Sequence, residues 1–329
     1  MLNNEIAEIM NTDGLVFETA SRTKYNLSLT SEQKEVAEVV DRWAKQIGER
    51  GSDPEHELSA FIIKTIEPVV YDTPDALVDA LFDRGSIDEF DDMTGLVNPK
   101  NTLKTYDATK GGSVPKSYID YTELSPVWKS KQIETEISYT QLRKNGFKTV
   151  ANLTTFMEEA LKNCLFFDAI AYLDSLITSS NTDQYFTSTG SLTQTAIDQL
   201  TLYLLEHGTN PFILGRTKYA QQIARMTGQS EYMSSAMKDD FNRYGLVNFI
   251  DGVRVAHIPS VVKVNEQPVL PDGKVFGIAD KIGTLDMRGS LRMYETFDNT
   301  AEKVDLKLTG FEYGFMISSP ENICKLTIQ

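Results

Sequence analysis

Cysteine is scarce in this sequence: only Cys164 and Cys324 occur, far apart, among 329 residues. A secreted disulfide scaffold or a zinc module needs more cysteines or closely spaced pairs, so both classes are excluded. Each of the two cysteines stands in an apolar run. We therefore predict that both are small core residues.

Histidine is almost as rare, since His56, His207 and His257 are the only three. This leaves little material for acid–base catalysis. His257 stands in a strand-like run before a proline, and we interpret it as a packed core residue rather than a ligand. The sequence also lacks the HExxH, GxSxG, phosphate-binding-loop and dinucleotide-binding motifs. No catalytic residue, metal site or cofactor is predicted.

Long apolar runs are absent as well. A membrane-spanning helix needs roughly 18 or more consecutive apolar residues, and the most hydrophobic stretch, 164–177, is interrupted by Asp168 and Asp174. The first residues lack the basic segment and the apolar core of a secretory signal. We expect no membrane partner and a soluble chain made in a cytoplasm.

Positive charge is in short supply: 32 Lys and Arg face 47 Asp and Glu, for a net charge of −15. Phosphate neutralisation by Lys and Arg supplies most of the affinity of DNA-binding proteins, so a dedicated DNA-binding function is disfavoured. Acidity that simply serves solubility is the alternative. The densest acidic stretch, 83–92, has neither the spacing nor the glycine of an EF-hand loop. A solvated turn is favoured there over a calcium site.

The sequence begins with a polar segment, 1–30, that we expect to form an arm ordered only against another surface. A helix is predicted over 31–50, because apolar residues recur there at steps of three and four. Short strands are predicted at 61–63 and 69–71, on either side of Pro68.

Two extended arms, Leu103–Tyr106 and Ser117–Tyr121, flank the segment 110–113, whose two glycines suit the end of a hairpin. The arms are rich in Tyr and Thr and poor in large aliphatic residues, so they cannot form a core alone. A two-stranded ribbon of this kind is marginal in water. We expect it to lie on another surface, of this chain or of a neighbour. A strand with strict alternation is predicted over 133–139.

The strongest helical pattern runs over 149–179, where apolar residues form one broad stripe without proline or glycine. A helix of about 30 residues would be roughly 45 Å long. One arm of a coiled coil is the alternative, but the stripe is too broad for a two-per-heptad seam. A helix lying across a sheet fits better.

Helices and strands alternate over 187–290, which predicts a compact α/β domain. The C-terminal region is predicted to be strand throughout, at 291–295, 304–308, 311–317 and 323–328. These strands need a partner layer, and the long helix is the obvious one. We therefore expect the C-terminus to return to the domain that begins near residue 56, with 187–290 as an insertion.

Three segments point to a known family: Trp128–Leu142, which leads from the hairpin into the long helix, the glycine-led strand Gly252–Pro259, and the near-terminal strand Gly310–Ile317. Their order and spacing resemble those of the major capsid proteins of tailed bacteriophages, the Hong Kong 97-type fold. No one segment is specific alone. The resemblance covers nearly the whole chain from about residue 56.

The resemblance implies an α+β fold with an N-terminal arm, an extended β-hairpin, a spine helix over the sheet of a peripheral domain, and an α/β axial domain. The implied boundaries are 1–55 for the arm and first helix, 56–94 for the start of the peripheral domain, 95–138 for the hairpin, 139–186 for the spine helix, 187–290 for the axial domain and 291–329 for the strands that complete the peripheral domain.

The resemblance further implies a structural protein and not an enzyme. Its copies would assemble through pentamers and hexamers into an icosahedral or prolate phage head, made in the bacterial cytoplasm. Implied partners are a portal protein, a separate scaffolding protein, decoration proteins and double-stranded DNA contacted non-specifically. The residues expected at contacts between subunits are Tyr106, Lys110, Lys116, Tyr118, Tyr121 and Trp128. Two alternatives stay open: an encapsulin with protein cargo, and a soluble α/β enzyme built on 187–290.

Overall fold

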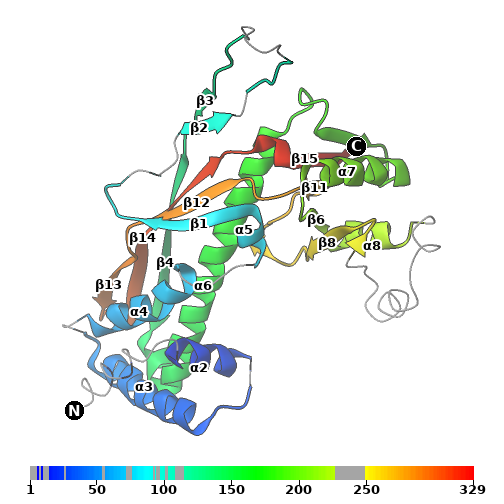
Figure 1. The fold of residues 1–329 in the computed structure, drawn as a ribbon. Coiled ribbons are helices and arrows are strands. Elements are labelled where there is room, and N and C mark those ends of the chain that lie inside the picture. The colour runs from blue at the N-terminus through cyan, green and yellow to red at the C-terminus, as the bar shows by residue number, and fades with distance from the viewer. Residues whose placement is uncertain are drawn as a thin grey trace.

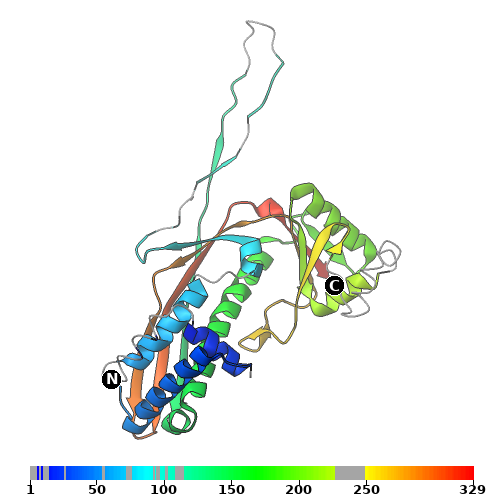
Figure 2. The ribbon, with the colours of Figure 1, turned by 60° about the horizontal axis from the view of Figure 1, so that its bottom comes forward.

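The computed structural model describes residues 6, 9, 15–25, 27–53, 56–71, 76–91, 93, 97–100, 103–107, 115–226 and 249–329. In this part of the chain, a five-stranded sheet lies along one long helix, α6, and a six-stranded sheet lies beside the C-terminal half of that helix (Figure 1). A narrow β-hairpin extends away from both (Figure 2).

The N-terminal helices pack beside α6. They are α2 (Leu15–Lys24), α3 (Ser31–Arg50), α4 (Glu57–Tyr71) and the short α5 (Ala76–Leu81). The sequence predicted α3, but the strands predicted at 61–63 and 69–71 are wrong, because both segments belong to α4. The buried side chains of α4 recur at helical spacing: Leu58, Phe61, Ile62, Thr65, Ile66, Val69 and Val70. Burial of this face outweighs the strand preference of its β-branched residues.

The first sheet is built around β14. Its strands are β1 (Phe82–Ile87), β4 (Val127–Ser138), β12 (Gly283–Arg288), β13 (Arg292–Asp298) and β14 (Lys303–Ile317). β4 pairs along one side of β14, whereas β12 and β13 pair with successive parts of its other side. β1 then pairs in parallel with β12. β1 and β4 are therefore opposite edges of this sheet.

β14 is one strand where the sequence predicted two, at 304–308 and 311–317. Its pairing with β4 shifts between Leu308 and Phe311, so the chain passes through a bulge instead of a turn. Gly310 in the bulge has a φ of 81°, and a Cβ there would lie 2.5 Å from a backbone oxygen. Gly310 is therefore the residue that lets the strand continue through the bulge.

The long helix α6 (Tyr139–Leu176) begins well before residue 149, where the regular apolar pattern starts. Ser138 and Gln141 form a capping box at its first turn. The backbone leaves helical geometry at Asn145, with a φ of −129°. The next residue, Gly146, lies so close to α3 that a Cβ would be 2.7 Å from a backbone oxygen. The sequence pattern predicted the helix only beyond this kink.

The second sheet has the strand order β5-β15-β11-β6-β8-β7. Its elements are β5 (Tyr185–Ser188), β6 (Phe212–Arg216), β7 (Phe249–Ile250), β8 (Val253–Ile258), β11 (Lys274–Ile278), β15 (Ile323–Ile328) and the covering helices α7 (Gln194–His207) and α8 (Thr217–Ala224). A two-stranded hairpin, β9 (Lys263–Val264) with β10 (Gln267–Pro268), contacts α6.

Both faces of the second sheet are buried along its strand β6. Along β6, Phe212 and Leu214 pack in the core shared with α6 and the first sheet, whereas Ile213 packs in a separate core under α7 and α8. Two expectations are corrected here. β15 joins this sheet through β11 and β5 and does not complete the first one. β12, from within 187–290, joins the first sheet.

The residues singled out by their scarcity have different environments. Cys324 is fully buried, and burial raises the pKa of its thiol. Cys164 is half-buried. His257 is exposed near the end of β8, so the prediction of a packed core residue is wrong. Within the acidic stretch 83–92, residues up to Ile87 belong to β1, and the turn follows them.

Candidate assembly surfaces

The extended hairpin projects from the first sheet. β2 (Val97–Lys100) pairs antiparallel with β3 (Asp120–Glu123), and the chain then enters β4 (Figure 2). Segments 103–107 and 115–119 continue the two arms. Lys110, predicted at the tip, lies outside the described residues.

The hairpin exposes large side chains. Those exposed are Leu103, Tyr106, Lys116, Tyr118, Ile119 and Tyr121. Tyr118 and Tyr121 are 72% and 66% exposed. Of the hairpin residues whose side chains the structure describes, none belongs to either core. Exposed aromatic surface of this kind is typical of a site that binds another protein.

Trp128, which was also expected at subunit contacts, packs on its own chain. It is half-buried on β4, opposite Gly314 of β14. A Cβ on Gly314 would lie 2.9 Å from the indole ring. The guanidinium of Arg288 lies over the ring, 3.7 Å from its centroid. The sequence analysis named Trp128 together with the hairpin tyrosines as residues expected at contacts between subunits. Its role between subunits stays a prediction.

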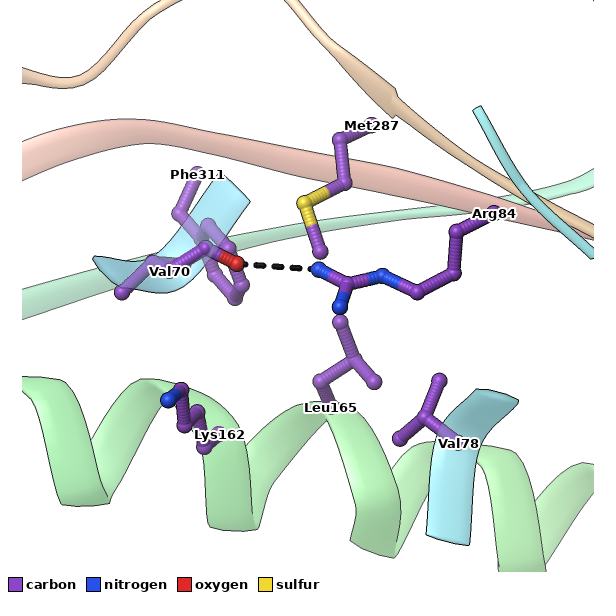
Figure 3. A pocket seen from close by; sticks show the side chains of 7 residues that line it. All are labelled: Val70, Val78, Arg84, Lys162, Leu165, Met287 and Phe311. Atoms are coloured by element: carbon purple, nitrogen blue, oxygen red, sulfur yellow. Dashed lines mark hydrogen bonds between the residues drawn. The ribbon is translucent and has the colours of Figure 1, made fainter. Parts of the chain in front are cut away.

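A narrow cleft lies between α4, α6 and the first sheet (Figure 3). It has about 10 Å³ of free space, close to the minimum for one water molecule. Arg84 extends into it between Leu165 and Met287 and donates hydrogen bonds of 3.1 Å to the carbonyls of Val70 and Tyr71. These carbonyls end α4 and have no partner within the helix. The cleft is a place where α4, α6 and the first sheet pack together, and it is too small for a ligand.

Replacing Arg84 with methionine is expected to lower the free energy of unfolding by about 1 to 3 kcal/mol, because the carbonyls at the end of α4 lose a charged donor. Urea unfolding of dispersed subunits, followed by tryptophan fluorescence, measures the change. Arg254→Met, on the exposed side of β8, is the control and should stay within about 0.5 kcal/mol. Equal midpoints for the two variants would contradict the capping role.

A buried carboxylate joins α6 to the first sheet. Asp168 is 8% exposed, and its Oδ2 accepts a hydrogen bond of 2.7 Å from the Tyr313 hydroxyl. The same oxygen lies 2.8 Å from Lys131 Nζ. Burial and the bond to Asp168 raise the pKa of Tyr313, so its hydroxyl remains a donor. One side chain thus connects α6 with β14 and β4.

A second carboxylate joins α6 to the second sheet. Asp174 Oδ2 accepts from Lys274 Nζ at 2.6 Å, and Asp174 Oδ1 accepts from Lys325 Nζ at 3.0 Å. Lys325 is only 5% exposed. Burial alone would raise the pKa of Asp174, but the hydrogen bonds from the two lysines outweigh it, and the pKa is lowered. Sequence analysis noted both aspartates only as interruptions of an apolar run.

Within the described ranges, no group of three or more His, Cys, Asp and Glu side chains is arranged to hold a metal ion. None of the helices in those ranges combines the length and the hydrophobicity that a bilayer crossing requires.

Comparison with known proteins adds independent findings. A family model described as "SPbeta prophage-derived putative capsid protein YonB" matches residues 7–321. A search of curated proteins finds no match. A solved structure from Gordonia phage Cozz shares 12% identity at a TM-score of 0.51, over 78% of this chain and 87% of that chain. A solved structure from Microbacterium phage Oxtober96 shares 10% sequence identity at a TM-score of 0.52, over 78% of this chain and 91% of that chain.

At these identities the structures show a shared fold, whereas the family model covers almost the whole sequence. The mixture of helices and strands is that of the two matched phage structures. The chain belongs to the family of the SPbeta prophage-derived capsid protein YonB, and it is a phage major capsid protein that forms the structural shell of the virion.

Proposed function

We propose that copies of this chain assemble through pentamers and hexamers into a closed icosahedral or prolate head, and that each extended hairpin lies over the adjacent copy. The observation that supports this is the row of exposed side chains on a hairpin without a core. Burial of apolar surface stabilises by about 25 cal/mol per Å², so the hairpin becomes stable when another surface covers it. Because it points away from its own body (Figure 2), a neighbour supplies that surface.

The other elements receive roles in the same proposal. The first sheet with α4 and α6 forms the peripheral domain. The second sheet with α7 and α8 forms the axial domain, whose copies meet at five- and six-fold centres. Because α2 and α3 pack on α6 of their own chain, they do not form a fused scaffold, which supports a separate scaffolding protein. A portal protein and decoration proteins complete the head. The chain is made in the host cytoplasm. Assembly of the shell requires no catalytic step by this chain.

The cargo of the proposed shell is double-stranded DNA. A net charge of −15 would repel phosphates, so packaged DNA would slide against the wall without adhering. The phage family supports DNA over the protein cargo of an encapsulin. Nuclease-protected DNA in native particles tests this, and particles that contain only protein would contradict it.

Substituting Tyr118→Ser together with Tyr121→Ser is expected to leave folded subunits that form shells with about tenfold lower yield. Each factor of ten corresponds to about 1.4 kcal/mol, which buried aromatic contacts commonly exceed. Negative-stain electron microscopy and sedimentation measure the yield, and circular dichroism checks the fold. Tyr25→Ser is the control, since this tyrosine is 58% exposed but lies beyond α2, far from the hairpin. Wild-type yield from the double variant would contradict the proposal.

A further inference from the structure

One side chain outside the hairpin is almost completely exposed. Phe90, in the turn that follows β1, has 94% of its surface open to solvent. A phenyl ring in this position contributes nothing to the core of its own subunit. Aromatic side chains that become buried at interfaces, by contrast, supply a large share of binding free energy. Phe90 is therefore a candidate for a contact with another chain.

The turn that carries Phe90 is held in place by two arginines. The carbonyl of Asp91 accepts a hydrogen bond of 2.8 Å from Arg288, and the carboxylate of Glu89 pairs with Arg292 at 2.6 Å. Arg288 is in turn fixed by its stacking on the indole ring of β4. A side chain that is positioned before binding loses little conformational entropy when it binds.

A cavity of about 240 Å³ opens at the opposite edge of the first sheet, where β4, α6 and the β9–β10 hairpin meet. Its apolar lining is Ile133, Ala160, Leu161, Cys164 and Val264, and polar side chains, among them Lys131 and Lys263, make up the rest. An apolar cavity of about 150 Å³ is known to take up a benzene molecule. This cavity is therefore large enough for one phenyl ring.

We propose that Phe90 of one copy inserts into this cavity of the adjacent copy, an inference that rests on the proposed assembly into capsomers. Charge complementarity supports this pairing. Asp88 and Asp91 stand on either side of the phenylalanine along the chain, and Lys263 stands at the cavity. Opposite charges at such an interface steer the two surfaces and fix their orientation.

The positions of the two features also suit a ring. Phe90 follows β1 and the cavity lies at β4, with β12 and β14 between these edge strands. The end of β1 and the β9–β10 hairpin lie on opposite sides of α6 (Figure 1). A contact between different surfaces of identical chains is head-to-tail, and it generates a ring when the rotation closes.

A second cavity, of about 280 Å³, lies on the other side of the β9–β10 hairpin. Phe167, Ile170 and Ala171 line it from α6. Its lining includes one cation, Arg216, and one carboxylate, Asp174, whereas the first cavity is lined by Lys131 and Lys263 and by no carboxylate. The charges therefore favour the cavity beside Lys263, and the second cavity provides a control.

A crosslinking experiment tests the contact directly, because Cys164 already lines the cavity. Phe90→Cys particles are assembled under reducing conditions and then oxidised with copper phenanthroline. The expected result is a ladder of disulfide-linked multimers on a non-reducing gel, absent from dispersed subunits and lost when Cys164→Ser is added. Tyr25→Cys particles, treated identically, should give no ladder. Phe90→Cys particles without a ladder would overturn the inference.

Filling the cavity provides a second test that stands even if Phe90→Cys does not assemble. Ala160→Trp should lower the yield of shells about tenfold, whereas Ala171→Trp, an exposed alanine on α6 in the second cavity, should stay within about twofold. Equal yields overturn the inference. If the wild-type chain forms no shells at all, the proposed assembly fails instead, so the two failures are distinguishable.

Discussion

Replacing Asp168 with alanine is expected to lower the free energy of unfolding of the subunit by about 3 kcal/mol, because a buried hydroxyl loses its acceptor and a lysine that is 31% exposed loses its counter-charge. The substitution removes the acceptor of the Tyr313 hydroxyl and the counter-charge of Lys131 together. Tyr313 is completely buried, so water cannot replace the lost hydrogen bond. Urea unfolding of dispersed subunits measures the effect.

A triple variant separates the cost of unpaired groups from the value of the network. Asp168→Leu combined with Lys131→Met and Tyr313→Phe should regain most of the stability, because apolar replacement of a complete buried pair is often neutral. Asp198→Ala, on the exposed side of α7, should change the stability by less than about 0.5 kcal/mol. If Asp168→Ala unfolds at the wild-type midpoint, Asp168 does not hold α6 to the sheet.

Those parts of the fold that have a local pattern could be predicted from the sequence. The apolar stripe of 149–179 predicts most of α6, because a helix that covers a sheet must present one broad apolar face. The alternation of 133–139 predicts the end of β4, since successive side chains of a strand face opposite sides. These patterns need no knowledge of the partner.

Features of the fold that depend on contacts with residues far away in the sequence could not be predicted. β15 has the same pattern as β13 and β14, and its place in the second sheet follows from pairing with β11 and β5. The bond between Lys325 and Asp174 reinforces that choice and has no local signal. Likewise, 61–63 has the β-branched composition of a strand, and only burial against α6 and the first sheet explains why α4 is helical.

The candidate contact residues divide in the same way. Tyr118 and Tyr121 could be proposed because an arm rich in Tyr and Thr and poor in large aliphatic residues cannot form a core. Trp128 was expected at the same contacts but packs on Arg288, since composition does not reveal which aromatic has a partner. Phe90 was missed because the acidic run around it indicated a solvated turn. Its signal was one large aromatic in a segment that offered it no apolar neighbours.

Replacing Asp174 with asparagine is expected to lower the free energy of unfolding at neutral pH by about 2 to 3 kcal/mol. The loss is smaller than for a fully buried pair, because the Asp174 side chain is 25% exposed. Lys325, whose side chain is 7% exposed, would keep its charge in the interior beside the backbone carbonyl of residue 174 and the ring of Tyr185, without a carboxylate at position 174. That unpaired charge is the source of most of the expected destabilisation.

The pH dependence identifies the carboxylate as the cause. Because the pKa of Asp174 is lowered in the folded state from its ordinary value of 3.8, its contribution is complete above that value and is lost as the pH falls through the lowered pKa. The difference in unfolding free energy between the wild type and Asp174→Asn should therefore be constant from pH 7 to about 5 and shrink below about pH 4. Asp183→Asn removes the same charge from an exposed position and should show no such difference at neutral pH. If the difference in unfolding free energy between the wild type and Asp174→Asn stays constant down to pH 3, the side chain acts through its shape. The two lysines would then not be held by its charge.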